Sequence, residues 1–247
     1  MDGELLLWIG CTSSYRVPDL ASSFMHILRA LKVDFKYLGS NEGCCGSILL
    51  RLGLRKEFSE VAKKTLNLIR STGARKLVTH CPGCLRAFRL DYPLQLGTDL
   101  GLEVQHSTQI ILDHVKPSIL KPVEIKAVYF DPCHLGRHMN VYEPPRHLLN
   151  MIPGMKLIEL NESREASLCC GAGGGVRACF EELALAVAQE VLDYIKLTGA
   201  EAIITACPFC YHNFKTASDG SLKVLDITQV IQASIEGGLH GSLGGRS

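Results

Sequence analysis

Short apolar segments alternate with longer amphipathic segments along the first half of the chain. Leu5–Ile9, Phe35–Leu38 and Lys76–Thr79 are short, largely apolar runs of the length of a strand. Leu20–Leu31 and Glu57–Ile69 instead carry apolar residues at the spacing of a helix. Strands that alternate with helices are typical of parallel α/β sheets. The pattern therefore predicts a small, mostly parallel sheet that is flanked by helices.

The same alternation recurs in the second half of the chain. The predicted elements there are strands over Ala127–Phe130, Lys156–Leu160 and Ala202–Thr205, and helices over Arg146–Met151 and Phe180–Leu197. Both halves therefore predict the same α/β fold class, with one small sheet in each.

The sequence also contains an internal repeat. Thr72–Cys84 (TGARKLVTHCPGC) matches Thr198–Cys210 (TGAEAIITACPFC) position by position. Further along, Val104–Ile111 (VQHSTQII) matches Val224–Ile231 (VLDITQVI). Self-similarity at a fixed distance indicates two copies of one structural unit.

We predict two tandem pseudo-symmetric repeats, residues 1–120 and 121–236. Pro117 and Pro122 flank a short segment at this division. The remaining residues, 237–247, are rich in glycine and predict a disordered tail.

Net charge and hydropathy exclude two classes of partner. The chain has 247 residues and a formal net charge of +1, so it lacks the positive field that attracts nucleic acid. No window approaches the roughly 20 apolar residues of a membrane span. The first ten residues have no basic segment, and their apolar run is too short for a signal peptide. We therefore expect a cytoplasmic protein that reaches a membrane only through a partner.

The cysteine content is unusual, because the chain contains 11 cysteines. The odd count, the missing export signal and the vicinal pairs Cys44–Cys45 and Cys169–Cys170 argue against disulfides. Neighbouring Cα atoms lie about 3.8 Å apart, which is shorter than the usual span of a disulfide. Clustered cysteines in such a chain are more often metal ligands or redox groups.

Ten of the cysteines form a five-cysteine motif that occurs twice. Its spacing is C-x32-CC-x35-C-x2-C in the first half and C-x35-CC-x36-C-x2-C in the second. The cysteines are Cys11, Cys44, Cys45, Cys81 and Cys84, and then Cys133, Cys169, Cys170, Cys207 and Cys210. Each of them follows a predicted strand or precedes a predicted helix. Because sites in open α/β folds form outside the carboxyl ends of strands, we expect each set to converge on one rim of its sheet.

The Cys-Pro-x-Cys segments have a local rationale. Pro82 and Pro208 suit the first position of a helix, which places Cys81 and Cys207 at the N-cap. A helix N-terminus offers free N–H groups and a partial positive charge, and both favour a thiolate.

Two kinds of metal site are compatible with clustered cysteines. Zinc takes four ligands, and a regular four-iron cubane also takes four cysteines. Each repeat here has five, so the fifth is either a spare or a bridge between irons. Since the vicinal pair occurs twice at matching positions, a zinc-stabilised structural module is the minority interpretation.

The doubled motif resembles that of the CCG, or cysteine-rich, domain family, which usually carries two copies. The stretch DPCHLGRH…LCCGAGGG…TACPFC is most similar to the catalytic cysteine-rich part of heterodisulfide reductases. This resemblance implies two non-cubane [4Fe-4S] clusters, with the ten motif cysteines as ligands. Larger relatives also carry a ferredoxin-like cysteine module, which is not found in this sequence. The resemblance therefore implies a separate ferredoxin-like iron–sulfur subunit or a flavoprotein subunit as the electron partner.

Three functions remain open on these grounds. The first is an iron–sulfur oxidoreductase subunit that reduces, or reversibly forms, a disulfide of small thiols or of a sulfur carrier. The alternative is an electron-transfer subunit of a lactate, glycolate or succinate dehydrogenase complex. The third is the zinc-stabilised structural module.

Other residues have less decisive interpretations. Cys179 lies outside both motifs at the start of a predicted helix and is expected to be a small core residue. Trp8 lies in a predicted strand and is expected in the core. His80, His134 and His138 lie beside motif cysteines, where hydrogen bonding around the site or simple exposure is expected. His134 is a weaker candidate for donating a proton to a departing thiolate.

Arg16, Arg137 and Arg177 flank elements of the motifs. They could bind an anionic substrate, offset the charge of a cluster, or lie in solvent. The sequence alone leaves these three alternatives open.

Overall fold

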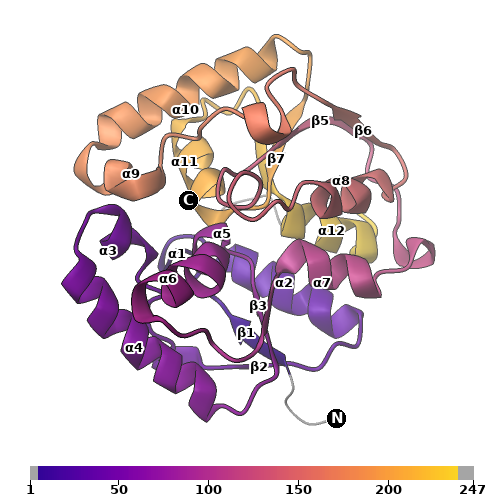
Figure 1. The fold of residues 1–247 in the computed structure, drawn as a ribbon. Coiled ribbons are helices and arrows are strands. Elements are labelled where there is room, and N and C mark those ends of the chain that lie inside the picture. Colours follow the sequence, from indigo (N-terminus) through magenta and orange to yellow (C-terminus); the bar gives the residue numbers. More distant parts are fainter. Residues whose placement is uncertain (1–4, 239–247) are drawn as a thin grey trace.

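Two parallel four-stranded sheets form the framework of the protein, as seen in the computed structural model, which describes residues 5–238 (Figure 1). The first sheet has the order β2-β1-β3-β4, with β1 (Leu5–Trp8), β2 (Lys36–Tyr37), β3 (Lys76–Thr79) and β4 (Glu103–His106). The second has the order β6-β5-β7-β8, with β5 (Ile125–Phe130), β6 (Met155–Ile158), β7 (Ala202–Thr205) and β8 (Lys223–Asp226). Identical order in both sheets confirms the predicted α/β fold with two pseudo-symmetric repeats.

Helices flank both sheets. The first half contains α1 (Cys11–Tyr15), α2 (Pro18–Ala30), α3 (Ser47–Arg51), α4 (Arg55–Ser71), α5 (Pro82–Arg86), α6 (Tyr92–Leu96) and α7 (Ser107–His114). The second half contains α8 (Glu143–Asn150), α9 (Val176–Cys179), α10 (Glu181–Lys196), α11 (Pro208–Ala217) and α12 (Ile227–Glu236). In the described residues, 5–238, no helix is long and apolar enough to cross a membrane.

The fourth strand of each sheet was not predicted. β4 and β8 are short and partly polar (EVQH and KVLD), so they lack a clear apolar run. Each strand ends in a residue that caps the next helix, His106 for α7 and Asp226 for α12, and both helices begin with a capping box. The matching segments VQHSTQII and VLDITQVI are therefore strand-to-helix junctions.

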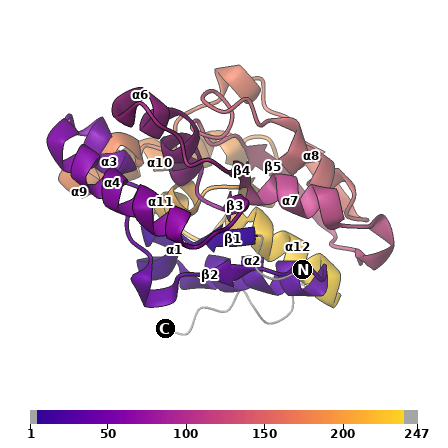
Figure 2. The same cartoon turned by 60° about the horizontal axis from the view of Figure 1, so that its bottom comes forward.

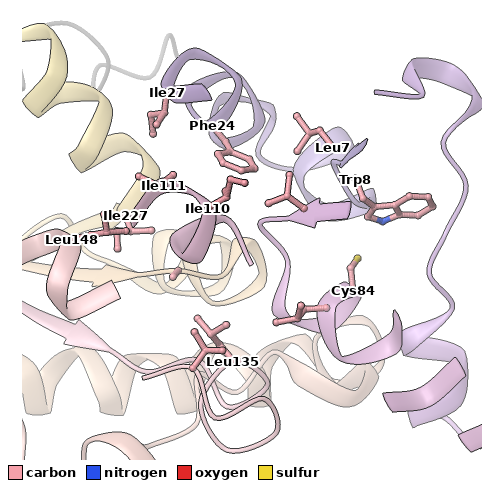
Figure 3. Packing of buried hydrophobic residues seen from close by; sticks show 14 of the residues in the cluster. Leu7, Trp8, Phe24, Ile27, Cys84, Ile110, Ile111, Leu135, Leu148 and Ile227 are labelled. Carbon is pink, nitrogen blue, oxygen red and sulfur yellow. The ribbon is translucent and has the colours of Figure 1, made fainter. Parts of the chain in front are cut away.

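The larger of two hydrophobic core clusters contains residues of both halves. α2 of the first half packs against α12 of the second, and α7 packs against α8 (Figures 1 and 2). Side chains from these helices meet in the core, among them Phe24, Ile27, Ile110, Ile111, Leu148 and Ile227 (Figure 3). Burying such a side chain contributes roughly 1.5–3 kcal/mol, so this contact holds the two halves together.

Two predictions about single residues have different outcomes. Trp8 is fully buried and meets the ring of Phe88 edge-on at 5.1 Å, which confirms its place in the core. Cys179 is exposed, so its prediction as a core residue is wrong. The reason is a break at Phe180, whose φ of −142° ends α9 and lets α10 begin only at Glu181.

The division between residues 120 and 121 lies in the connection between α7 and β5 and stays a prediction. The predicted disordered tail falls almost entirely on residues 239–247, which lie outside the described residues.

Gly171 provides a test of how tightly the second repeat is built. It has a φ of +83°, and a Cβ atom there would lie 2.7 Å from the carbonyl oxygen of Ala184. Gly220 has a similar φ of +86° but nothing within 4 Å of such a Cβ. Both alanine substitutions carry the left-handed backbone penalty, and only Gly171→Ala adds overpacking of about 1–3 kcal/mol.

We therefore expect Gly171→Ala to lower the thermal midpoint by roughly 2–12 °C more than Gly220→Ala does. Circular dichroism on both variants in the same cofactor state measures the difference. Equal midpoints for the two variants would show that the turn after Cys170 can relax.

Candidate functional site

All ten motif cysteines line a single cavity between the two halves, which we call the sulfur cavity. It lies at the carboxyl ends of the strands of both sheets, since β1, β3, β5 and β7 each end two or three residues before a motif cysteine. The sequence predicted one rim for each half. The structure brings the two rims together, so that five thiols from each half face one shared space.

The Cys-Pro-x-Cys segments adopt the predicted geometry. Cys81 and Cys207 are the N-cap residues of α5 and α11, and both have extended backbone. Pro82 and Pro208 occupy the first turn of these helices. The side chains of both N-cap cysteines therefore lie at a helix N-terminus, where free N–H groups favour a thiolate.

The vicinal pairs have matching geometry in the two halves. The second cysteine of each pair is buried, and its sulfur lies close to the last cysteine of the motif. The Sγ–Sγ distances are 3.3 Å for Cys45 and Cys84 and 3.2 Å for Cys170 and Cys210. The first cysteine of each pair is exposed and accepts a hydrogen bond from the second following amide, at 3.3 Å in the first half and 3.4 Å in the second.

The main chain of each vicinal pair is held by a buried donor. The Tyr92 hydroxyl donates to the carbonyl of Cys45 at 3.2 Å, and the Asn213 side-chain amide donates to the carbonyl of Cys170 at 2.6 Å. Different side chains therefore hold the carbonyl of the second vicinal cysteine in the two repeats. Tyr92 belongs to α6, which follows Cys84, and Asn213 belongs to α11, which contains Cys210.

Several of these thiols favour the thiolate form. The Cys84 thiol and the backbone N–H groups of Cys84 and Gly83 lower the pKa of Cys81 to about 7, against the effect of burial. Hydrogen bonds from Cys11 and Cys45 lower the pKa of Cys44 far below its usual value. Since the thiolate is the form that binds metal, these shifts prepare Cys44 and Cys81 as ligands. Hydrogen bonds between thiols and burial instead raise the pKa of Cys11, Cys45 and Cys84.

The donor set fits iron–sulfur clusters. Thiolates are soft ligands that suit iron–sulfur clusters, zinc or Cu(I). Within residues 5–238, no three cysteine, histidine, aspartate or glutamate side chains converge as ligands of a single metal ion. The thiols of both halves instead line one shared space, and soft thiolates around such a space suit inorganic clusters with several metal atoms.

His80 joins the two halves beside the sulfur cavity. Its ring is buried, with Nδ1 2.6 Å from Oγ of Ser107 and Nε2 2.9 Å from Oδ2 of Asp226, which belongs to the second half. This confirms hydrogen bonding over exposure for His80. The sequence did not predict the contact of Asp226 with His80. The matching segments around His106 and Asp226 indicated only that these two residues occupy equivalent positions.

His134 and His138 belong to the second half and lie close to Arg51 of the first. His134 lines the sulfur cavity, and its ring stacks on that of His138 with the centroids 4.6 Å apart. Burial, together with the positive charges of His138 and Arg51, lowers the pKa of His134 to about 4. The imidazole is therefore neutral at pH 7 and can donate one N–H hydrogen bond into the cavity.

Glu42 is a second residue that sequence reasoning missed. Its carboxylate accepts hydrogen bonds from the amides of Ile9 and Gly10, at 2.9 and 2.6 Å, and burial raises its pKa to about 7. It thereby fixes the turn that carries Cys11. The only signal for Glu42 in the sequence is its position two residues before Cys44.

The corresponding residue of the second half is Ser167. Arg137 donates to its carbonyl at 2.6 Å and to its hydroxyl at 2.9 Å. Arg137 is therefore engaged in holding the loop before the second vicinal pair. Arg16 and Arg177 lie elsewhere, in the lining of a second cavity.

A family comparison agrees with this geometry. The cysteine-rich (CCG) domain pattern matches residues 5–89 and 127–215. The chain belongs to the cysteine-rich domain family. This confirms the family resemblance, and one match falls in each of the two repeats seen in the structure.

Several curated relatives are oxidoreductases or iron–sulfur proteins. The chain is 38% identical to a subunit of the dihydromethanophenazine:CoB–CoM heterodisulfide reductase of Methanosarcina acetivorans, over 92% of this chain and 57% of the relative. It is 33% identical to an EtfAB:quinone oxidoreductase of Syntrophomonas wolfei, over 94% of this chain and 34% of the relative. It is 32% identical to an iron–sulfur protein of Methanococcus maripaludis, over 89% of this chain and 42% of the relative.

The chain thus spans about half the length, or less, of the curated relatives it matches. These names agree with the prediction of an iron–sulfur oxidoreductase component that works with further protein segments or subunits. Among solved structures, a glutamate racemase of Francisella tularensis aligns with 94% of this chain and 78% of its own, at a TM-score of 0.42 and 12% identity. A similarity this low supports no functional statement.

Asp226 is the natural target for a test of the contact between the halves. Asp226→Ala removes two contacts. Oδ1 of Asp226 caps α12 by accepting a hydrogen bond from the amide of Thr228 at 2.8 Å, and Oδ2 is the partner of His80. The loss of a cap and of one buried hydrogen bond costs about 2–4 kcal/mol together. We expect the thermal midpoint to fall by roughly 5–15 °C.

Asp113→Ala serves as the control, because Asp113 is exposed near the end of α7. Its midpoint should stay close to that of the unchanged protein. If Asp226→Ala melts like this control, the hydrogen bond between the halves contributes nothing measurable.

Proposed function

We propose that the chain is an iron–sulfur oxidoreductase subunit that reduces, or reversibly forms, a disulfide of small thiols or of a sulfur carrier. The observation that carries this proposal is the convergence of all ten motif cysteines on one cavity. A module that only stabilised a fold would need one closed site in each half. Here the two sets of thiols are open to the same space, which suits chemistry on a bond held between them.

Each half would hold one non-cubane [4Fe-4S] cluster. The ligands of the first would be Cys11, Cys44, Cys45, Cys81 and Cys84, and those of the second Cys133, Cys169, Cys170, Cys207 and Cys210. The close Sγ–Sγ approach of 3.3 Å in the first set and 3.2 Å in the second supports a pair of neighbouring ligands in each half. Such a pair would give each cluster one thiol more than the four that a regular four-iron cubane takes.

When bound, two clusters that each supply one electron provide the two electrons that split a disulfide into two thiolates. The chain's own residues shape the space for this reaction. Ile48, Pro132 and Phe209 give the cavity apolar walls that exclude water. The neutral His134 can donate its N–H to a sulfur that gains negative charge. These residues therefore position and stabilise the sulfur atoms of a substrate.

Electrons would arrive from a partner. We propose a ferredoxin-like iron–sulfur subunit, a flavoprotein subunit, or both. The relative of Syntrophomonas wolfei is named an EtfAB:quinone oxidoreductase, and this name supports an exchange of electrons with a separate protein partner. The same name also agrees with the alternative of a pure electron-transfer subunit. Cleavage assays on single-site variants distinguish this alternative from a disulfide reductase.

Metal analysis tests the cofactor. Protein prepared without oxygen should be brown and contain about eight irons and a similar amount of acid-labile sulfide per chain, because each site holds a four-iron cluster. Elemental analysis and sulfide determination give both numbers. Stoichiometric zinc without sulfide would instead support the structural interpretation.

Single-site variants test the paired mechanism. Cys81→Ala and Cys207→Ala should each lose one cluster, about half of the iron, and both should lose disulfide cleavage. Single-turnover cleavage by chemically reduced protein measures the effect. Cys179→Ala is the matched control, since this cysteine is exposed and outside both motifs, and it should keep iron and cleavage. Near-normal cleavage by a variant that lacks one cluster would favour the electron-transfer alternative.

A further inference from the structure

A second cavity of about 650 Å³ adjoins the sulfur cavity, and we call it the outer cavity. It is lined by α1 and Ile48 of the first half and by residues of α9, α10 and α11 of the second, and α1 contacts α11. Cys11, Thr12, Ile48 and Phe209 line both cavities. A small molecule in the outer cavity would therefore lie next to the first set of thiols.

The pseudo-symmetry of the repeats shows why the outer cavity lies on this side. Thr12 corresponds to His134 in the second repeat, and Arg16 corresponds to His138. On the Arg16 side, the small Thr12 leaves space beside Phe209. On the other side, the two stacked histidine rings fill the equivalent position next to Gly83, the counterpart of Phe209. The Arg16 side is therefore the one that offers a ligand open space next to a motif cysteine.

The outer cavity carries an excess of positive charge. Arg177 donates to Glu181 at 3.1 Å and also to Asn213, so its charge is offset. The side chain of Arg16 is exposed, and its guanidinium has no hydrogen bond or ion pair within the part of the chain that the structure describes. His212 also lines the cavity and can present a ring N–H to it. An anion would complement Arg16 and accept a hydrogen bond from His212.

We propose that the outer cavity binds the oxyanion, a carboxylate or a phosphate, of a small thiol or disulfide, with Arg16 as its main partner. The planar guanidinium of arginine matches such groups in a bidentate manner. Cys11 and Arg16 both line the outer cavity. An oxyanion at Arg16 and a sulfur beside Cys11 can therefore belong to one small molecule, for example mercaptopropionate.

Binding of a ligand that cannot react tests the subsite by itself. The probe is 3,3′-thiodipropionate, a thioether dicarboxylate, titrated calorimetrically into the cluster-loaded full chain under anaerobic conditions. Arg16→Gln should weaken its binding about 10- to 100-fold, because a charge-assisted hydrogen bond is lost. Arg55→Gln, which changes an exposed arginine at the start of α4, should leave the affinity unchanged.

The neutral analogue 2,2′-thiodiethanol should bind more weakly than thiodipropionate and be indifferent to Arg16→Gln. Competition by inorganic phosphate at millimolar concentration would identify phosphate as the preferred oxyanion, and its failure to compete would identify the carboxylate. Equal affinity of Arg16→Gln and the unchanged protein for thiodipropionate would overturn the subsite.

Since this inference rests on the proposed function, a second measurement separates the two. Chemically reduced protein is mixed with dithiodipropionate or with bis(2-hydroxyethyl) disulfide, which is neutral, in single turnover. Preference for the dianion that disappears in Arg16→Gln supports both ideas. Equal cleavage of the two disulfides refutes the subsite alone. Binding of thiodipropionate through Arg16 without cleavage of either disulfide refutes the proposed function alone.

Discussion

The contact between the two halves is the constraint on which the site depends. α2 packs on α12 and α7 on α8, and the buried pair of His80 and Asp226 crosses between the halves at the same place. Asp226 also caps α12 of the second half, as His106 caps α7 of the first. The N-terminus of one interface helix in each half is therefore held by a capping side chain. Because the strands end where the halves meet, this packing turns two separate rims of thiols into one cavity.

Crowding of thiols in that cavity has an electrostatic consequence. The thiols of Cys84 and Cys210 donate hydrogen bonds to the sulfurs of Cys45 and Cys170, which raises the pKa of Cys84 and of Cys210, and burial and the charge of neighbouring thiolates raise both further. The thiols therefore cannot all ionise unless positive charge enters the cavity. A metal centre supplies this charge, so its binding would also contribute to the stability of the fold.

The two repeats keep one backbone plan but differ in the residues that surround the sulfur cavity. Glu42 holds the turn before Cys11 through two amides, whereas Arg137 holds the loop around Ser167 in the second repeat. Thr12 and His134 occupy equivalent positions with very different volumes. The protein is thus pseudo-symmetric at its thiols and asymmetric around them.

The sequence by itself determined the α/β alternation, the two repeats and the N-cap positions of Cys81 and Cys207, because these depend on residues within one strand, turn or repeat. It missed the short strands β4 and β8, whose polar residues are used to cap helices, and it placed Cys179 in the core although a break at Phe180 exposes it. Only the tertiary structure decided that ten cysteines share one cavity and that His80 binds Asp226. Such contacts join residues far apart in sequence, and their existence depends on how the two halves pack.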